Sequence, residues 1–188
     1  MALQSRSFNL LPEVIKNLMI INGLFFVATL VFNSTFGIDL AEYLGLFLPA
    51  SPLFQPYQII THMFMHGGLM HIFSNMFALW LFGMALENVW GPKRFLLYYL
   101  VTGLGAALLH LGVLYWEYFS LINQMTPAGI ADVKTFGAEL LNSNRNYLDA
   151  NQSALNLLLN MPTVGASGAV FGVLLAFGMM FPNQYIYI

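Results

Sequence analysis

The sequence predicts an all-α membrane protein built as a bundle of transmembrane helices. Of its 188 residues, 59% are hydrophobic and only 7% are charged, with a mean hydropathy of +0.70, whereas an average soluble domain carries about a quarter charged residues. Four apolar stretches reach or approach the roughly 20 residues that cross a bilayer. Six Lys and Arg face eight Asp and Glu without a basic cluster, so nucleic-acid binding is not expected. The absence of cysteine excludes disulfides and thiolate metal sites.

The four predicted spans cover residues 17–36, 69–89, 95–118 and 167–185, within a membrane domain over 17–188. Residues 1–16 form a short N-terminal segment before the first span. The fourth span barely reaches the necessary length before the sequence stops at Ile188, and Pro182 and Asn183 indicate its far boundary. We therefore expect four of a larger set of spans, with the last part of the domain missing.

The positions of the cations predict the orientation, because Lys and Arg are retained on the cytoplasmic side. One group precedes the first span or lies in the tight turn between the second and third: Arg6, Lys16, Lys93 and Arg94. Only Lys134 and Arg145 lie in the other connections. This pattern predicts a cytoplasmic N-terminus, outer loops over 37–68 and 119–166, and a multi-pass protein of the bacterial inner membrane.

The two outer loops differ in composition. Residues 37–68 are too apolar for a solvated loop and too interrupted by proline for a span, so we expect them in the membrane interface. Residues 131–159 have helical spacing of apolar side chains and predict one or two surface helices joined near 142–146. The apolar positions are Val133, Phe136, Leu140, Leu141, Leu148, Leu155 and Leu158.

His71 and Asn75 are four residues apart in the second predicted span, so their side chains share one helix face. Together they can present two hydrogen-bond donors to one point. Donors held in a low-dielectric site stabilise a developing oxyanion. The alternative is an ordinary hydrogen bond between helices.

Ser167 lies at the predicted start of the fourth span, between Gly165 and Gly168. Flanking glycines permit close approach of other backbone, and the free N–H groups of a first helical turn can add to an oxyanion site. The alternative role for this serine is a helix N-cap. Gly168, Gly172 and Ala176 form a stripe of small residues suited to close helix packing.

Four further polar residues lie in or beside the apolar segments. His62 and His66 precede the second span, and structural roles are favoured for both, although zinc ligation together with His71 is conceivable. Neither the spacing nor a nearby carboxylate supports zinc, and we expect no metal or cofactor. Glu87 is expected to bond a helix terminus, and His110 to be a buried hydrogen-bond partner.

Two segments together resemble the rhomboid intramembrane serine proteases: residues 61–75, with sequence Thr-His-Met-Phe-Met-His-Gly-Gly-Leu-Met-His-Ile-Phe-Ser-Asn, and Gly165-Ala-Ser-Gly. The resemblance covers the first four of the family's six core spans. It implies a rhomboid-like helical bundle that cleaves transmembrane proteins near the outer leaflet of the lipid bilayer.

Carried over by position, the resemblance implies that Ser167 is the nucleophile, with its own N–H in the oxyanion hole. His71 and Asn75 would donate from their side chains to that hole. His62, His66, Gly165 and Gly168 match supporting positions, and Glu87 matches an acid that ties the second span to its neighbours. The stripe on the fourth span would pack against the family's sixth span.

The sequence departs from the family pattern in one respect, because the family's general base is a histidine on the sixth span and no histidine follows His110. A serine without a base is a poor nucleophile, so we expect the 188-residue chain to be inactive and incomplete. The alternative is a non-catalytic rhomboid-like protein that binds transmembrane helices. A third hypothesis is a proton relay through His62, His66 and His71 in a channel or transporter.

Overall fold

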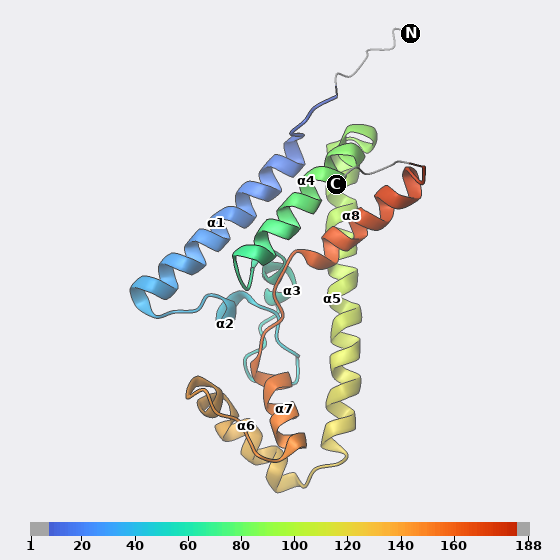
Figure 1. Ribbon diagram of the computed structural model, residues 1–188. Coiled ribbons are helices and arrows are strands. Elements are labelled where there is room, and N and C mark those ends of the chain that lie inside the picture. The colour runs from blue at the N-terminus through green and yellow to red at the C-terminus, as the bar shows by residue number, and fades with distance from the viewer. Residues whose placement is uncertain (1–7, 184–188) are drawn as a thin grey trace.

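The computed structural model describes residues 8–183. In that range the regular secondary structure consists of helices, with one isolated β-bridge. Three helices are long and apolar enough to cross a membrane: α1 (Glu13–Phe36), α4 (Leu69–Trp90) and α5 (Pro92–Ile122). Together with α8 (Ser167–Met180) they form the bundle in the upper part of Figure 1. The prediction of an all-α membrane protein is confirmed.

The spanning helices begin and end at Pro and Gly. α1 starts earlier than predicted because Pro12, in an extended conformation, precedes its first turn, and it ends at Gly37 in a left-handed conformation with φ of 67°. Gly91, with φ of 80°, separates α4 from α5. Pro92 then occupies the first turn of α5, where no backbone N–H is needed.

α8 is shorter than the predicted fourth span. It has 14 residues, which gives a length of about 21 Å against a hydrocarbon core of about 30 Å. The helix stops at Met180 because Phe181 precedes Pro182, and a residue before proline is disfavoured in the helical conformation. A helix of this length is too short to cross the hydrocarbon core by itself. Residues 1–7 with Arg6, and residues 184–185 of the predicted span, lie outside the described range.

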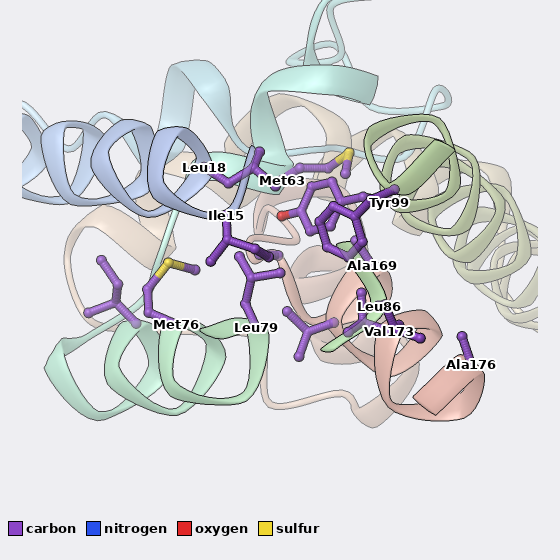
Figure 2. Packing of buried hydrophobic residues seen from close by; sticks show 14 residues of the cluster. Ile15, Leu18, Met63, Met76, Leu79, Leu86, Tyr99, Ala169, Val173 and Ala176 are labelled. Carbon is purple, nitrogen blue, oxygen red and sulfur yellow. The ribbon is translucent and has the colours of Figure 1, made fainter. Parts of the chain in front are cut away.

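The core of the bundle lies between α1, α4, α5 and α8. Figure 2 shows Leu79 of α4, Tyr99 of α5 and Val173 of α8 directed into this space, and all three are fully buried. α1 contributes Ile15 and Leu18. Burial of such side chains contributes about 1.5–3 kcal/mol each in water, and in lipid the same contacts act through close packing.

The glycines of the small-residue stripe on α8 face α5, so the stripe packs against a helix of this chain. A Cβ atom built on Gly168 would lie 2.6 Å from Ala106 Cβ, and one on Gly172 would lie 2.5 Å from Thr102 Cβ. The Tyr98 hydroxyl also donates a 2.8 Å hydrogen bond to the Gly172 carbonyl. The two helices therefore approach closely enough that neither glycine can carry a side chain without a shift.

The two predicted outer loops lie together at the lower end of the molecule in Figure 1. The first contains α2 (Ala41–Leu44), α3 (Gln58–Thr61) and the 3₁₀ helix η1 (His62–Phe64), and the second contains α6 (Pro127–Asn142) and α7 (Ala150–Asn160). The N–H and C=O groups of Leu46 pair with those of Thr163 at 2.9 and 2.8 Å. This bridge joins the first loop to the segment that precedes Ser167.

One stretch of the first loop is buried against the rest of the molecule. Leu46, Phe47 and Leu48 are each 1% exposed, and Leu46 and Leu48 pack in a second core cluster with α5, α6 and α7. The second loop has the two predicted helices, but Phe136 and Leu148 of the apolar pattern are exposed. Leu148 precedes α7 and lies in the turn, so helical spacing does not apply to it.

Candidate active site

Ser167 is the first residue of α8 and lines a cavity of ≈ 320 Å³. The walls come from α5, η1 and the segment 163–165 before α8, and they include His62, His110 and Thr163. The cavity lies at the N-terminal end of α8. The serine hydroxyl is therefore next to polar groups.

The Ser167 hydroxyl does not cap α8, so its alternative role as the helix N-cap is not observed. The N-cap residue is Ala166, and the helix start has no side-chain cap hydrogen bond. The N–H groups of a first helical turn have no partner within the helix, and the partial positive charge of that end favours anions. The hydroxyl and these N–H groups are therefore both available to a ligand.

Gly165 brings the second and fourth predicted spans together. Its φ of 131° is a conformation that disfavours any other residue, and its N–H donates a 2.9 Å hydrogen bond to the His62 carbonyl. A Cβ atom built here would lie 3.0 Å from His71 Nε2 and 3.5 Å from Ser167 Oγ. His71 Nε2 and Ser167 Oγ therefore both lie beside Gly165, no farther apart than the sum of these two distances.

The His71 ring presents a donor toward Gly165. The Gly67 N–H donates to His71 Nδ1 at 3.4 Å, so Nδ1 must be unprotonated in the neutral ring. The proton is thus assigned to Nε2, the ring nitrogen that lies against Gly165. An Nε2–H group in this position is suited to donate to an anionic oxygen beside Ser167.

Asn75 lies one turn beyond His71 on α4 and is only 6% exposed. Its Nδ2 atom is buried and has no hydrogen-bond partner among the described residues. A buried unpaired donor costs about 1–3 kcal/mol. Such a donor next to the His71 turn is an arrangement that a ligand oxygen would satisfy.

His62 and His66 surround these groups in a neutral state. His62 Nδ1 donates to the Gln58 carbonyl at 2.9 Å, and burial lowers the His62 pKa. Burial, with a smaller contribution from His71, lowers the pKa of His66 to about 4, and the His66 and His71 rings meet edge to face at 5.2 Å. A neutral His66 does not support a proton relay near neutral pH.

A group of three potential metal ligands is not found within residues 8–183. The His66 ring lies beside His71, whereas His62 lines the cavity that also contains His110 and Ser167.

His110 is closer to the site than the sequence suggested. Its Nε2 atom lies 2.8 Å from Thr163 Oγ1, so it holds the segment that leads to Ser167, which the Leu46 bridge holds from the other side. The spacing of Gly103, Ala107 and His110 on α5 places two small residues and the imidazole on one helix face. This pattern could have indicated that another segment packs closely against His110.

Glu87 lies at the far end of α4 from the site and is 4% exposed. Its two carboxylate oxygens accept hydrogen bonds of 3.0 Å from the N–H groups of Val14 and Ile15. These are first-turn donors of α1, where a negative charge is also favoured by the helix dipole. Glu87 therefore fixes the start of α1 on α4 and takes no direct part in the site.

Comparison with known proteins shows which proteins the whole chain is similar to. The model of the Rhomboid domain matches residues 53–188. Mitochondrial RHOMBOID-like protein 12 of Arabidopsis thaliana is 27% identical over 179 residues, which cover 94% of this chain and 44% of that protein. Mitochondrial RHOMBOID-like protein 6 of the same plant is 38% identical over 55 residues, covering 29% of this chain and 18% of that protein.

Rhomboid-like protein 15 of Arabidopsis thaliana is 28% identical over 127 residues, covering 62% of this chain and 30% of that protein. The chain thus spans less than half the length of these curated relatives. No solved structure matches the chain.

Proposed function

The chain belongs to the rhomboid family, and we propose that it provides the nucleophile and oxyanion hole of an intramembrane serine endopeptidase that cleaves transmembrane proteins near the outer leaflet. The observation that carries this proposal is the close approach of the His71 ring and the Ser167 hydroxyl at Gly165. Two residues almost a hundred positions apart approach each other there, and Ser167 and Gly165 also line the cavity beside α5.

The reaction proposed for this site is acyl transfer. Ser167 Oγ attacks a carbonyl carbon of the substrate and forms a tetrahedral intermediate with a negatively charged oxygen. His71 Nε2–H, Asn75 Nδ2–H and the Ser167 N–H donate to that oxygen. Expulsion of the amine leaves an acyl-enzyme, which water then hydrolyses to free the serine.

The step that this chain does not account for is removal of the serine proton. The four histidines are residues 62, 66, 71 and 110, and none of them hydrogen-bonds Ser167 Oγ among the described residues. By the resemblance, the base would be a histidine of another span. We therefore expect the 188-residue chain alone to show no turnover.

The experiment is labelling with a fluorophosphonate probe, applied to the full gene product and to this chain. The full product should be labelled, and Ser167→Ala should abolish labelling. Asn75→Ala should label about 10²- to 10³-fold more slowly, because one oxyanion donor is removed. Ser74→Ala is the matched control: its hydroxyl bonds only the His71 carbonyl on the exposed side of α4, so labelling should keep the parent rate. Equal labelling of the parent and Ser167→Ala would refute the assignment.

The same lack of a base favours a second candidate, a non-catalytic rhomboid-like protein that binds transmembrane helices. If this second candidate is correct, the full product should not be labelled by the fluorophosphonate. It should bind transmembrane segments, and Ser167→Ala should bind them equally well. The labelling experiment thus separates the two.

The proposed location is a bacterial inner membrane with the N-terminus in the cytoplasm, supported by Lys16, Lys93 and Arg94 at one end of the bundle. Because the chain has no cysteine, single cysteines can report sidedness. Leu148→Cys, at a fully exposed position, should react with an impermeant maleimide in intact cells, and Lys93→Cys only after lysis. The reverse result would invert the orientation.

A further inference from the structure

A second cavity, of ≈ 390 Å³, lies at the loop end of the molecule, between the first outer loop and the α6–α7 hairpin. We call it the outer cavity. The two cavities share no lining residue, but three short chain segments contribute to both. Leu46 lines the active-site cavity and Phe47 the outer cavity. His62 and Gln58 are divided in the same way, as are Thr163 and Asn160. The Leu46–Thr163 bridge joins two of these segments.

The lining of the outer cavity suits a long side chain with an apolar stem and a cationic head. Glu42 supplies a carboxylate, and Tyr43 and Tyr57 supply half-exposed aromatic rings. Leu53 and Leu141 line the apolar part. Lys and Arg bury their methylene stems along such surfaces, and their charged heads are attracted both by a carboxylate and by aromatic faces.

The charge of the surrounding loops points the same way. The two outer loops carry five acids, Asp39, Glu42, Asp132, Glu139 and Asp149, against the bases Lys134 and Arg145. No Lys or Arg is among the residues that line the outer cavity. An excess of one sign around a cleft raises the local concentration of ligands of the other sign.

We propose that the outer cavity binds a basic side chain in the outer flank of the transmembrane protein on which this site acts. The inference rests on the proposed function in one respect, namely that the ligand is a membrane-spanning polypeptide. A segment held at Ser167 would have its outer flank near the outer cavity, because three short chain segments contribute to both cavities. Recognition of the flank is then separate from the chemistry at the serine.

The test is a binding titration with the Ser167→Ala chain in lipid nanodiscs, so that no covalent step contributes. The probes are two synthetic single-span peptides that differ at one position of the outer flank, Lys in one and Gln in the other, and fluorescence energy transfer reports binding. The Lys peptide should bind about two- to fivefold more tightly, the range of an exposed ion pair. This preference should weaken in high salt.

Two variants locate the preference. Glu42→Gln should abolish it, whereas Glu139→Gln, which removes the same charge from an exposed α6 position outside the lining, should retain it. Equal affinity of both peptides for the parent, or equal loss in both variants, would overturn the proposal. A Lys preference that persists while the full product resists fluorophosphonate labelling would reject the protease and keep the outer cavity as a binding site.

Discussion

Replacing Gly165 by alanine tests whether the local geometry of the 163–167 segment assembles the site. The residue has φ of 131°, and strained backbone of this kind costs about 1–3 kcal/mol for a residue with a side chain. The new methyl group would also lie 2.9 Å from His71 Cε1 and 3.0 Å from Nε2. Both distances are shorter than an ordinary contact, so the ring must move. A displacement of about 1 Å at a catalytic group can cost on the order of 10²-fold in rate.

The assay combines thermal denaturation in detergent with the rate of fluorophosphonate labelling of the full gene product. Gly165→Ala should lower the melting temperature and slow labelling by about 10²-fold or more. Gly23→Ala is the control, because a Cβ there meets nothing within 4 Å and alanine is the better helix former. Its labelling should be unchanged and its stability equal or higher. Parent-like labelling of Gly165→Ala would show that the His71 contact does not position the site.

Three further changes have expected outcomes in thermal or chemical denaturation. Glu87→Gln should destabilise the protein by about 1–2 kcal/mol, because a charged acceptor at a helix start becomes neutral; an unchanged melting temperature would contradict this. Gly172→Leu should cost about 1–3 kcal/mol by overpacking against Thr102, whereas Gly178→Leu, in open space, should not. Stability should fall as the pH is lowered from 6.5 toward 4, because the unfolded chain protonates His66 first while its folded pKa is about 4. His66→Gln should reduce that slope, and an unaltered profile would show that another group titrates.

The apolar runs were sufficient to place the three long helices to within a few residues, because a span must satisfy its backbone internally and be apolar throughout. Pro12 and the Gly91–Pro92 pair even indicate where two of them start. The length of α8 was misjudged for a related reason. Hydrophobicity continues past Met180, but Pro182 ends the helix, and hydropathy does not register that constraint.

The contacts that build the site are of another kind. Leu46 and Thr163 are far apart in sequence, and no local composition indicates that their backbones pair. The pairing depends on burial of the first loop against α5 and the hairpin, which its proline-rich sequence did not reveal. The spacing of His71 and Asn75 predicted a shared helix face, but only the fold places that face against Gly165.

The distribution of unpaired polar groups distinguishes the site from the rest of the bundle. Four buried side-chain atoms lack a partner among the described residues: Asn22 Oδ1, His66 Nε2, Asn75 Nδ2 and Tyr99 OH. The Asn22 and Tyr99 side chains lie against each other, so a small shift pairs them. His66 and Asn75 instead flank His71 on either side. Apolar residues of similar size there would avoid the cost of an unpaired group, so packing alone does not explain this pair.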